Sequence, residues 1–480
     1  MGIKFYKSQE FPLEMHKVRT IQKLNLLPID KRLEAIKKAG NNTFLLDSNE
    51  VFLDMLTDSG VNAMSDKQVA AMMMADDSYA GSESYKRLET KVKEFFHMDY
   101  FLPAHQGRAC EHILSKVFIK PGNIVINNYH FTTAKAHMEI NGGQVLELFT
   151  KEAVEPKSDN PFKGDLDIEK LKAIIKTDKD NIAFVRMELG TNLIGGQPVS
   201  LKNLQEVAKI CRENNLLVVF DASLLTDNLY FIKEREKEFQ HLSIKEINKL
   251  VFACADLVYC SFRKLSSARG GGIVTNNKDI YIKVRELIPL YEGFLTYGGM
   301  SVREIEAITV GLDEALDYEM INQGPQFIAE MCRLFQENNV PVITPPGGLG
   351  CHLDARAFLS HLKPDEYQAG ALCSAIYLAS GIRGMERGTI SESRKEDGSE
   401  TFANIELVRL ALPRRVFTLS QIRYAVDRIS WLYDNRHLIG GLKFSEEPKV
   451  LRFFLGKLEE NSPWQEKLVN KFKADFKDSL

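Results

Sequence analysis

Two short segments of the chain pass directly from apolar residues into groups that can do chemistry. Residues 218–223 resemble a buried strand that ends at Asp221, and residues 258–264 resemble another that leads into Ser261 and Lys264. Ligands of open α/β sheets bind beyond the carboxyl ends of the strands, where this carboxylate and this amine would meet. Pyridoxal phosphate needs both groups, an acid for its pyridine nitrogen and an amine for a Schiff base. The alternative is that Asp221 and Lys264 close two unrelated strands and are solvated or paired with other charges.

A second group of residues has the chemistry of an anion site. Gln106, Gly107 and Arg108 stand between a predicted strand and a predicted helix, where free backbone N–H groups and the helix dipole favour a phosphate. Gly107 allows the backbone to approach closely, and Arg108 adds positive charge. Ser261 and Arg263 can contribute further donors. An ordinary surface turn would have the same residues, so this signal alone is weak.

The elements that must position these residues alternate between strands and helices. Helical periodicity over residues 167–175 and 200–214 separates some of the strands, which predicts βαβ units and a parallel sheet covered on both faces. Phe131, just after one predicted strand, can stack on a pyridine ring, although a phenylalanine there also suits a core. The predicted strands cover residues 100–104, 124–127, 145–149, 183–189, 217–221, 257–261 and 272–275.

The pattern changes after about residue 305, which predicts a second, smaller α+β domain. Helical stretches over residues 302–319 and 328–337 lead into a glycine-rich turn and then short elements. In the tail, Trp464, Leu468, Phe472 and Phe476 recur every four residues, a stripe expected to dock on the chain's own surface or an oligomer mate rather than on another partner. The predicted parts are a large cofactor-binding domain at 58–312, an N-terminal arm and small domain at 1–57 and 313–461, and the tail at 462–480.

Composition excludes several classes of function. The chain has 480 residues, a net charge of −3 and no basic excess, so nothing indicates nucleic acid or an anionic membrane as a partner. The N-terminus lacks the apolar core of a signal peptide, and no stretch approaches a membrane span. The seven cysteines are scattered and never form Cys-x-x-Cys. These features predict a protein of the reducing cytoplasm without metal chemistry at cysteine.

Ordered motifs across about residues 21–458 carry a family resemblance. The chain resembles the aromatic amino-acid β-eliminating lyases, tyrosine phenol-lyase and tryptophanase, which are pyridoxal-phosphate enzymes of the aspartate aminotransferase fold (fold type I). The matching blocks include Leu56-Thr57-Asp58-Ser59-Gly60, Tyr79-Ala80-Gly81-Ser82-Glu83, His105-Gln106-Gly107-Arg108, Gly195-Gly196-Gln197-Pro198, Met385-Glu386-Arg387-Gly388, Val408-Arg409-Leu410 and Leu451-Arg452-Phe453-Phe454.

The resemblance implies roles for residues near the cofactor. Lys264 would hold pyridoxal phosphate covalently and then remove the substrate Cα proton, and Asp221 would keep the ring nitrogen protonated. Phe131 would stack on the ring, and Asn192 would lie beside the cofactor O3′ and the substrate carboxylate. The implied phosphate ligands are Gln106, Gly107, Arg108, Ser261 and Arg263.

It also implies residues for the substrate, an interface and a cation. Arg409, assisted by Ser59, would bind the substrate carboxylate, and Tyr79, supplied across a subunit interface, would protonate the leaving group. The resemblance therefore implies an active unit of at least a dimer, and a homotetramer as the expected assembly. A monovalent cation such as K⁺ would bind at Gly60, Asp77 and the backbone of Arg269, although close relatives carry Glu and Asn at the last two positions.

The resemblance further distinguishes between the two lyases. Tyrosine-type enzymes handle the phenolic hydroxyl with a Thr at position 132 and with the Met-Glu-Arg of Met385 to Arg387, whereas tryptophan-type enzymes have an acidic residue at 132, an apolar one at 387 and a His at 453. This chain has Thr132, Arg387 and Phe453. The resemblance also implies that Phe454 contacts the substrate. The expected reaction is therefore β-elimination of L-tyrosine to phenol, pyruvate and ammonia.

Two departures keep other activities open. Leu224 stands where relatives carry an Arg that donates to the cofactor O3′, and Phe262 stands where a Gly precedes the lysine pair, adding bulk close to the phosphate and the mouth of the site. The alternatives are tryptophanase, a C–S lyase acting on S-substituted cysteines, an aminotransferase, and a non-catalytic homologue kept for binding or assembly.

Overall fold

A seven-stranded sheet organises one of the two units of the chain. The computed structural model describes residue 5 and residues 11–480. It divides into a sheet unit, Asp58–Asn322, and a terminal unit, Met1–Thr57 with Gln323–Leu480. The strand order in the sheet is β2-β8-β7-β6-β5-β3-β4, and only β8 runs antiparallel to its neighbours. The strands are β2 (Tyr100–Ala104), β3 (Ile124–Asn127), β4 (Gln144–Glu147), β5 (Ile182–Glu188), β6 (Val218–Asp221), β7 (Leu257–Ser261) and β8 (Gly271–Thr275).

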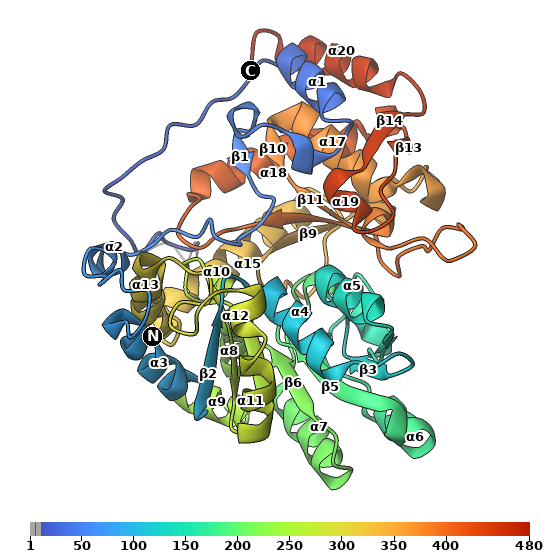
Figure 1. The fold of residues 1–480 in the computed structure, drawn as a ribbon. Helices are drawn as coiled ribbons and strands as arrows, with labels where there is room; N and C mark the ends of the chain where they lie inside the picture. Colours follow the sequence, from blue (N-terminus) through green and yellow to red (C-terminus); the bar gives the residue numbers. More distant parts are fainter. Residues whose placement is uncertain (1–4, 6–10) are drawn as a thin grey trace. The chain divides into compact units, whose positions relative to one another are not determined.

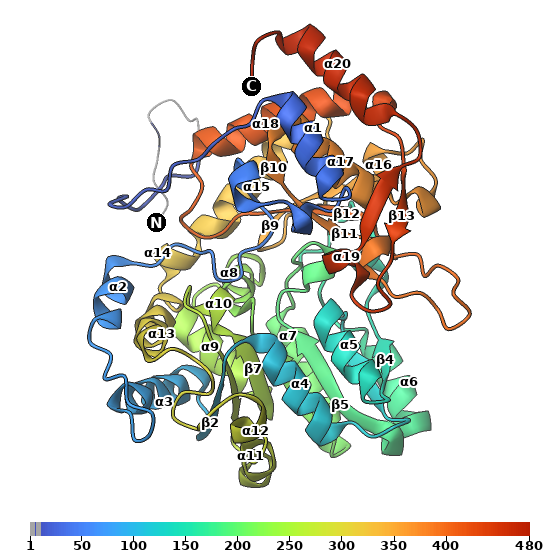
Figure 2. The same cartoon turned by 45° about the horizontal axis from the view of Figure 1, so that its top comes forward.

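These strands confirm the predicted βαβ pattern, and their apolar runs are explained by burial of both faces. Val258 and Cys260 of β7 belong to one apolar core, while Leu257 and Tyr259 belong to another, because successive side chains of a strand point to opposite faces. Helices flank the sheet in Figures 1 and 2. They are α2 (Asp66–Met72), α3 (Glu83–Phe96), α4 (Gly107–Phe118), α5 (Thr132–Ile140), α6 (Ile168–Asp178), α7 (Leu201–Glu213), α8 (Leu225–Arg235), α9 (Ile244–Phe252), α10 (Phe262–Leu265), α11 (Lys278–Arg285), α12 (Ile288–Tyr291), α13 (Val302–Glu314) and α14 (Tyr318–Ile321).

The helix predicted over residues 302–319 is wrong in one respect, because it is interrupted. The chain leaves the α13 helix after Glu314, and α14 begins only at Tyr318. The Asp317 side chain accepts a hydrogen bond from the Glu319 backbone N–H and so caps the second helix. A short acidic side chain that binds a nearby N–H favours a new helix start over a continuous helix.

The terminal unit combines small sheets with a helical layer. The antiparallel sheet β11-β12-β9 is accompanied by the pairs β1-β10 and β13-β14. Every residue of α17 is buried, so this helix forms the centre of the unit. The strands are β1 (Leu53–Asp54), β9 (Gly350–Asp354), β10 (Ile382–Arg383), β11 (Met385–Arg387), β12 (Leu407–Ala411), β13 (Leu442–Glu446) and β14 (Lys457–Glu460). The helices are α1 (Ile29–Lys38), α15 (Gln323–Glu337), α16 (Ala355–Phe358), α17 (Gln368–Ser380), α18 (Leu419–Asp434), α19 (Arg452–Leu455) and α20 (Trp464–Phe476).

The apolar stripe of the tail lies on α20, which packs against α1 and α17 of its own unit. Trp464, Leu468 and Phe472 are buried, and the Phe472 ring meets Trp431 of α18 edge to face at a centroid distance of 5.6 Å. The sequence left open whether the stripe docks on the chain's own surface or on an oligomer mate, and the structure places it on the chain's own surface. No helix in the described part of the chain is long and apolar enough to cross a membrane.

Candidate functional site

The Lys264 amine lies beside an aromatic ring and a carboxylate. Lys264 is on α10, which starts directly after β7, so the strand end delivers the side chain. Its Nζ lies 5.5 Å from the centre of the Phe131 ring and 3.7 Å from Asp58 Oδ1. Two residues predicted from the sequence are thus brought together. Asp58 was not singled out, although it belongs to one of the motifs that carry the resemblance.

The predicted phosphate ligands gather where β2 and β7 end. A Cβ atom added to Gly107 would lie 3.0 Å from the Ser261 Cβ, so these two backbones are in close approach. Gly107 is the first residue of the twelve-residue α4, whose first N–H groups have no partner within the helix. Burial, followed by the nearby charge of Arg269, lowers the pKa of Arg263, and Arg108 acts in the same direction. Clustered guanidinium groups beside a helix N-terminus fit an anion.

Asp221 ends β6 and is held by two donors. Its Oδ2 accepts a hydrogen bond from Arg186 Nη2 at 2.7 Å, and its Oδ1 accepts one from the Ser223 backbone N–H at 3.0 Å. Arg186 and Glu188 of β5 were not selected from the sequence. The signal was present, because two charged residues at alternate positions interrupt an otherwise apolar buried strand and must share one face of the sheet.

Asn192, Ser59 and Thr132 complete the candidate residues placed around these groups. The backbone N–H of Asn192, a buried residue, donates to Glu188 Oε1 at 3.0 Å. Ser59 Oγ accepts from Arg263 Nε at 3.3 Å. Thr132 is buried at the start of α5, and its hydroxyl has no hydrogen-bond partner within the described part of the chain. A hydroxyl in that condition is available to a bound ligand.

Tyr79 lies on the surface. Its side chain is 68% exposed and stacks on Phe294 at a centroid distance of 5.6 Å. A hydrogen bond with Tyr297 raises the pKa of the Tyr79 phenol. None of its described contacts is with Lys264 or Asp221, so a role in the reaction requires that Tyr79 acts on another copy of the chain.

The three positions suggested for a monovalent cation have other neighbours. A Cβ atom at Gly60 would lie 2.6 Å from the Arg263 guanidinium, Asp77 is exposed, and the Arg269 backbone N–H donates to Glu304. No group of three or more His, Cys, Asp or Glu side chains within the described residues could hold a metal ion. The cation site stays a prediction.

In the terminal unit, Arg409 lies within a small buried cluster. Arg409 of β12 pairs in register with Met385 on one side and with His352 on the other. Its Nη2 donates to the Leu56 carbonyl at 2.7 Å and contacts Met385 Sδ at 2.8 Å. Burial, followed by the charge of Arg409, lowers the pKa of His352 to about 3, so this imidazole is neutral at physiological pH. His352 was not identified from the sequence.

Arg387 faces an aromatic side chain in the same unit. Its guanidinium carbon lies 6.0 Å from the centre of the Phe453 ring, and both residues are almost fully buried. Phe453 and Phe454 are neighbours on α19, with ring centroids 4.0 Å apart. A guanidinium beside aromatic rings combines a donor with a flat apolar surface, which suits a phenolic ring.

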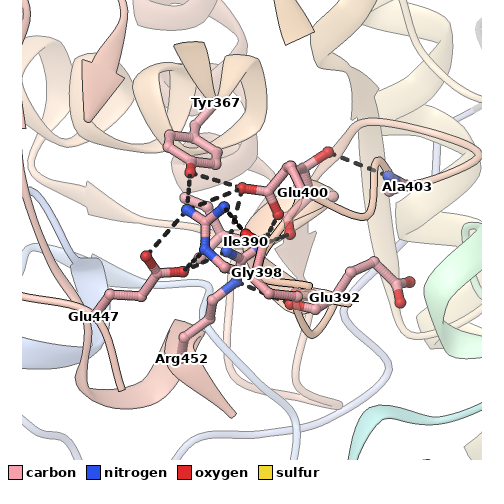
Figure 3. A network of polar contacts seen from close by, with 12 residues as sticks. Tyr367, Ile390, Glu392, Gly398, Glu400, Ala403, Glu447 and Arg452 are labelled. Carbon is pink, nitrogen blue, oxygen red and sulfur yellow. Dashed lines mark hydrogen bonds and ion pairs between the residues drawn. The ribbon is translucent and has the colours of Figure 1, made fainter. Parts of the chain in front are cut away.

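A network of charged groups holds α19 in place, as Figure 3 shows. Arg452 donates to the Thr389 carbonyl at 2.6 Å and to Glu447 Oε1 at 2.6 Å, and it forms a close ion pair with Glu400. The Tyr367 hydroxyl donates to Glu400 at 2.8 Å. Arg452 therefore ties the segment that follows Arg387 to the helix that carries Phe453 and Phe454.

The two departures noted in the sequence have different outcomes. Leu224 is buried at the start of α8, close to Gly190, and has no donor. The expectation that Phe262 adds bulk at the mouth of the site is wrong. Its side chain is fully buried in the core, with its ring 6.5 Å from that of Phe101, and it lies over Gly272. Phe262 therefore fills space between sheet and helices that glycine would leave empty.

Comparison with known proteins agrees with this geometry. The family model described as "Beta-eliminating lyase" matches residues 54–427. The chain belongs to this family. It is 39% identical over 454 residues to a tyrosine phenol-lyase of Pasteurella multocida (strain Pm70), covering 94% of this chain and 99% of the relative. It is 41% identical over 454 residues to a tyrosine phenol-lyase of Lacrimispora saccharolytica, covering 94% and 97%.

Solved structures show the same fold at low sequence identity. A serine palmitoyltransferase of Sphingomonas wittichii aligns with a TM-score of 0.55 at 14% identity, covering 81% of this chain and 88% of that one. A threonine aldolase of Leishmania major aligns with a TM-score of 0.56 at 13% identity, covering 79% and 99%. The fold is that of the fold-type I enzymes that use pyridoxal phosphate, and the protein is a pyridoxal-phosphate-dependent lyase.

The residues of the sheet unit fit this cofactor. The anion cradle near Gly107 would hold its phosphate, and the Lys264 amine over the Phe131 ring would meet its aldehyde beside the flat ring. The fixed carboxylate of Asp221 would meet its pyridine nitrogen. Bound there, pyridoxal phosphate would supply an electron sink for charge that develops at the substrate Cα.

Proposed function

We propose that the protein catalyses β-elimination of L-tyrosine to phenol, pyruvate and ammonia. The observation that carries the proposal is the buried Arg387 guanidinium beside the Phe453 ring, because elimination of phenol requires control of the phenolic hydroxyl. Identities of 39–41% to proteins named tyrosine phenol-lyase support it.

The sheet unit would supply the proton transfer and hold the cofactor. Lys264 removes the substrate Cα proton, and Asp58 beside its amine stabilises the protonated form that results. Asp221 accepts a hydrogen bond from the ring nitrogen and keeps it protonated. Phe131 stacks on the ring. The phosphate ligands in this proposal are Gln106, Gly107, Arg108, Ser261 and Arg263.

The remaining residues would bind the substrate. Arg409 binds the carboxylate, since a guanidinium fork matches two carboxylate oxygens, and Ser59 and Asn192 assist. Arg387 and Thr132 bind the phenolic hydroxyl. The apolar walls are formed by Met385, Phe453 and Phe454.

Tyr79 would protonate the leaving carbon in the active site of a neighbouring subunit. Its exposure, together with the exposed Met73 and Met74 nearby in sequence, is consistent with an interface at this surface. A homotetramer, a K⁺ site at Gly60, Asp77 and Arg269, and a cytoplasmic location are parts of the same proposal.

The test is a comparison of three substrates with one purified preparation. Pyruvate release is measured from L-tyrosine, L-tryptophan and S-methylcysteine, with phenol and indole quantified separately. We expect pyruvate and phenol in equal amounts from L-tyrosine and no indole from L-tryptophan. Pyruvate release from S-methylcysteine but none from L-tyrosine would contradict the proposal and indicate a C–S lyase. That activity does not need Arg387, and the absence of a donor at Leu224 is compatible with it.

A further inference from the structure

One guanidinium lies at the centre of a polar cluster inside the sheet unit. Arg186 is completely buried, and each of its five N–H groups reaches an acceptor. Nε donates to the Tyr259 hydroxyl at 2.8 Å, and Nη1 donates to Asn127 Oδ1 at 3.2 Å and Glu188 Oε2 at 3.3 Å. Nη2 donates to Glu188 Oε2 at 3.3 Å and Asp221 Oδ2 at 2.7 Å. Because every N–H group of this buried guanidinium is hydrogen-bonded, the side chains of its four partners are held in fixed orientations.

The register of four neighbouring strands brings these side chains together. Asn127 of β3 pairs with Arg186 of β5, Glu188 pairs with Asp221 of β6, and Asp221 pairs with Tyr259 of β7. The side chains share one face because same-face residues are two apart along each strand. The cluster therefore rests on the backbone ladder and not on mobile loops, so Asp221 has a fixed orientation.

The charges of the cluster explain what Arg186 does for Asp221. Asp221 and Glu188 are buried carboxylates on adjacent strands, and without a cation between them they could not both ionise. One proton would then be shared, and a protonated Asp221 cannot accept a hydrogen bond from a protonated ring nitrogen through the same oxygen. Burial raises the pKa of Glu188 while the charge of Arg186 opposes that shift. Arg186 Nη2 lies 2.7 Å from Asp221 Oδ2 and 3.3 Å from Glu188 Oε2, so the closer ion pair with Asp221 favours placing an excess proton on Glu188.

We propose that Arg186 is a positioning residue that holds Asp221 ionised and oriented for the cofactor ring nitrogen, with Glu188 as the carboxylate that absorbs any excess proton. The inference rests on the proposed role of Asp221. Arg186 contacts Asp221 on the side away from the cofactor and in this way helps to keep the ring nitrogen protonated. This contribution matters in this chain because Leu224 has no side-chain donor for the cofactor.

Other titratable groups interact with this cluster and can therefore affect the pH dependence of cofactor binding. Burial, followed by the charge of Asp221, raises the pKa of Glu111 on α4 to about 7. Lys264 of α10 favours the ionised form of Glu188. The buried titratable groups that the charge of Asp221 influences are Arg186 and Glu188 of β5, Tyr259 and Cys260 of β7, and Cys110 and Glu111 of α4.

The experiment measures cofactor affinity, independently of any substrate. Holoprotein is stripped of cofactor and titrated with pyridoxal phosphate between about pH 6 and pH 9. For Arg186→Met we expect binding weakened about tenfold or more near neutral pH and recovering as pH rises, because the shared proton is then lost. Arg186→Lys keeps the charge and should stay within about threefold of the parent at every pH. Arg186→Met/Glu188→Gln should recover part of the loss, since a single carboxylate remains.

The controls separate this inference from a general loss of stability. Arg32, another completely buried arginine, donates to the carbonyls of Leu378 and Leu27 in the terminal unit. Arg32→Met should lower the melting temperature without changing the pH profile of cofactor binding. Should Arg186→Met not fold, Arg186→Lys and Glu188→Gln carry the test, because both keep Asp221 ionised and should bind cofactor nearly as the parent does.

Two results would overturn the proposal. The first is parental affinity and pH profile in folded Arg186→Met. The second is a loss in Glu188→Gln as large as in Arg186→Met. The variant Asp221→Asn tests the role of Asp221 separately. If Asp221→Asn binds cofactor like the parent, the proposed role of Asp221 is wrong. If it binds cofactor more weakly, a negative result for Arg186→Met contradicts only the role of Arg186. Glu111→Gln, run through the same pH series, removes the titration of Glu111 from the comparison.

Discussion

A single side chain, Lys264, carries the covalent chemistry proposed for this protein. Its amine lies over the Phe131 ring and beside Asp58, and only 13% of the side chain is exposed. Borohydride reduction of the holoprotein should therefore attach the phosphopyridoxyl group to the peptide that contains Lys264. Peptide mapping by mass spectrometry checks this, with Lys264→Ala as the unlabelled control. Label on another lysine in the parent protein would contradict the assignment.

A second side chain, Arg387, distinguishes the tyrosine-cleaving activity from the C–S lyase activity. Because its guanidinium lies beside the Phe453 ring, Arg387→Ala should depress elimination from L-tyrosine by roughly 10²–10⁴, the usual worth of a general acid–base group. Elimination from S-methylcysteine should change little, since a thiolate leaves without ring tautomerisation. Arg409→Ala should impair both substrates through the carboxylate. Steady-state kinetics on the two substrates measure this, and equal losses in Arg387→Ala would show that Arg387 does not act on the phenol.

At the scale of elements, α20 shows how a sequence stripe becomes structure. Phe472 is fully buried, and both Arg32 and Arg428 lie over its ring at 5.3 and 5.7 Å from its centre. Phe472→Ala should destabilise the protein by about 3–5 kcal/mol, because a cavity replaces an aromatic ring. Lys467→Ala, an exposed position on the same helix, should change the free energy of unfolding by less than about 0.5 kcal/mol. Urea unfolding followed by tryptophan fluorescence compares the two, and equal values would mean that the stripe contributes no packing energy.

At the scale of the whole molecule, buried acids make stability depend on pH. Burial raises the pKa of Asp165 to about 7, against the hydrogen bonds that it accepts from Ser200. The folded protein retains this proton between about pH 4 and pH 7 while the unfolded chain has lost it, so stability falls as pH rises through that window. Asp165→Asn keeps the acceptor for the Ser200 N–H and should flatten the slope, with a gain on the order of 4 kcal/mol at about pH 8. An unchanged slope in unfolding experiments at about pH 5 and pH 8 would exclude Asp165 as its source.

Assembly is the other property of the whole molecule that the proposal requires. Tyr79 is exposed and has no described contact with Lys264, so the role proposed for Tyr79 in the reaction needs a second copy of the chain. Mixing Tyr79→Phe with Lys264→Ala subunits should restore part of the activity, because some sites then combine an intact Tyr79 with an intact Lys264. The measurement is pyruvate release after subunit exchange shown by native mass spectrometry. No recovery despite exchange would count against shared sites.

The strands, the polar residues at their ends and the family could be predicted from the sequence alone. Apolar runs that end at Asp221 and Ser261 predict buried parallel strands, since an uninterrupted apolar run is expected where both faces of a strand are covered. The boundary between a predicted strand and a predicted helix placed Gly107 at a helix start. The motifs then indicated a lyase, because several blocks in order are specific even where each one alone is weak.

Which side chains contact one another became known only from the folded structure. Arg186 reaches Asp221, and Asp58 reaches Lys264, because sheet order and register join residues distant in sequence. His352 lies beside Arg409 for the same reason, and Phe262 turns into the core although its position next to Arg263 suggested the site. Local periodicity specifies the face on which a side chain lies, whereas its neighbours depend on strand order and packing, which are properties of the whole folded chain.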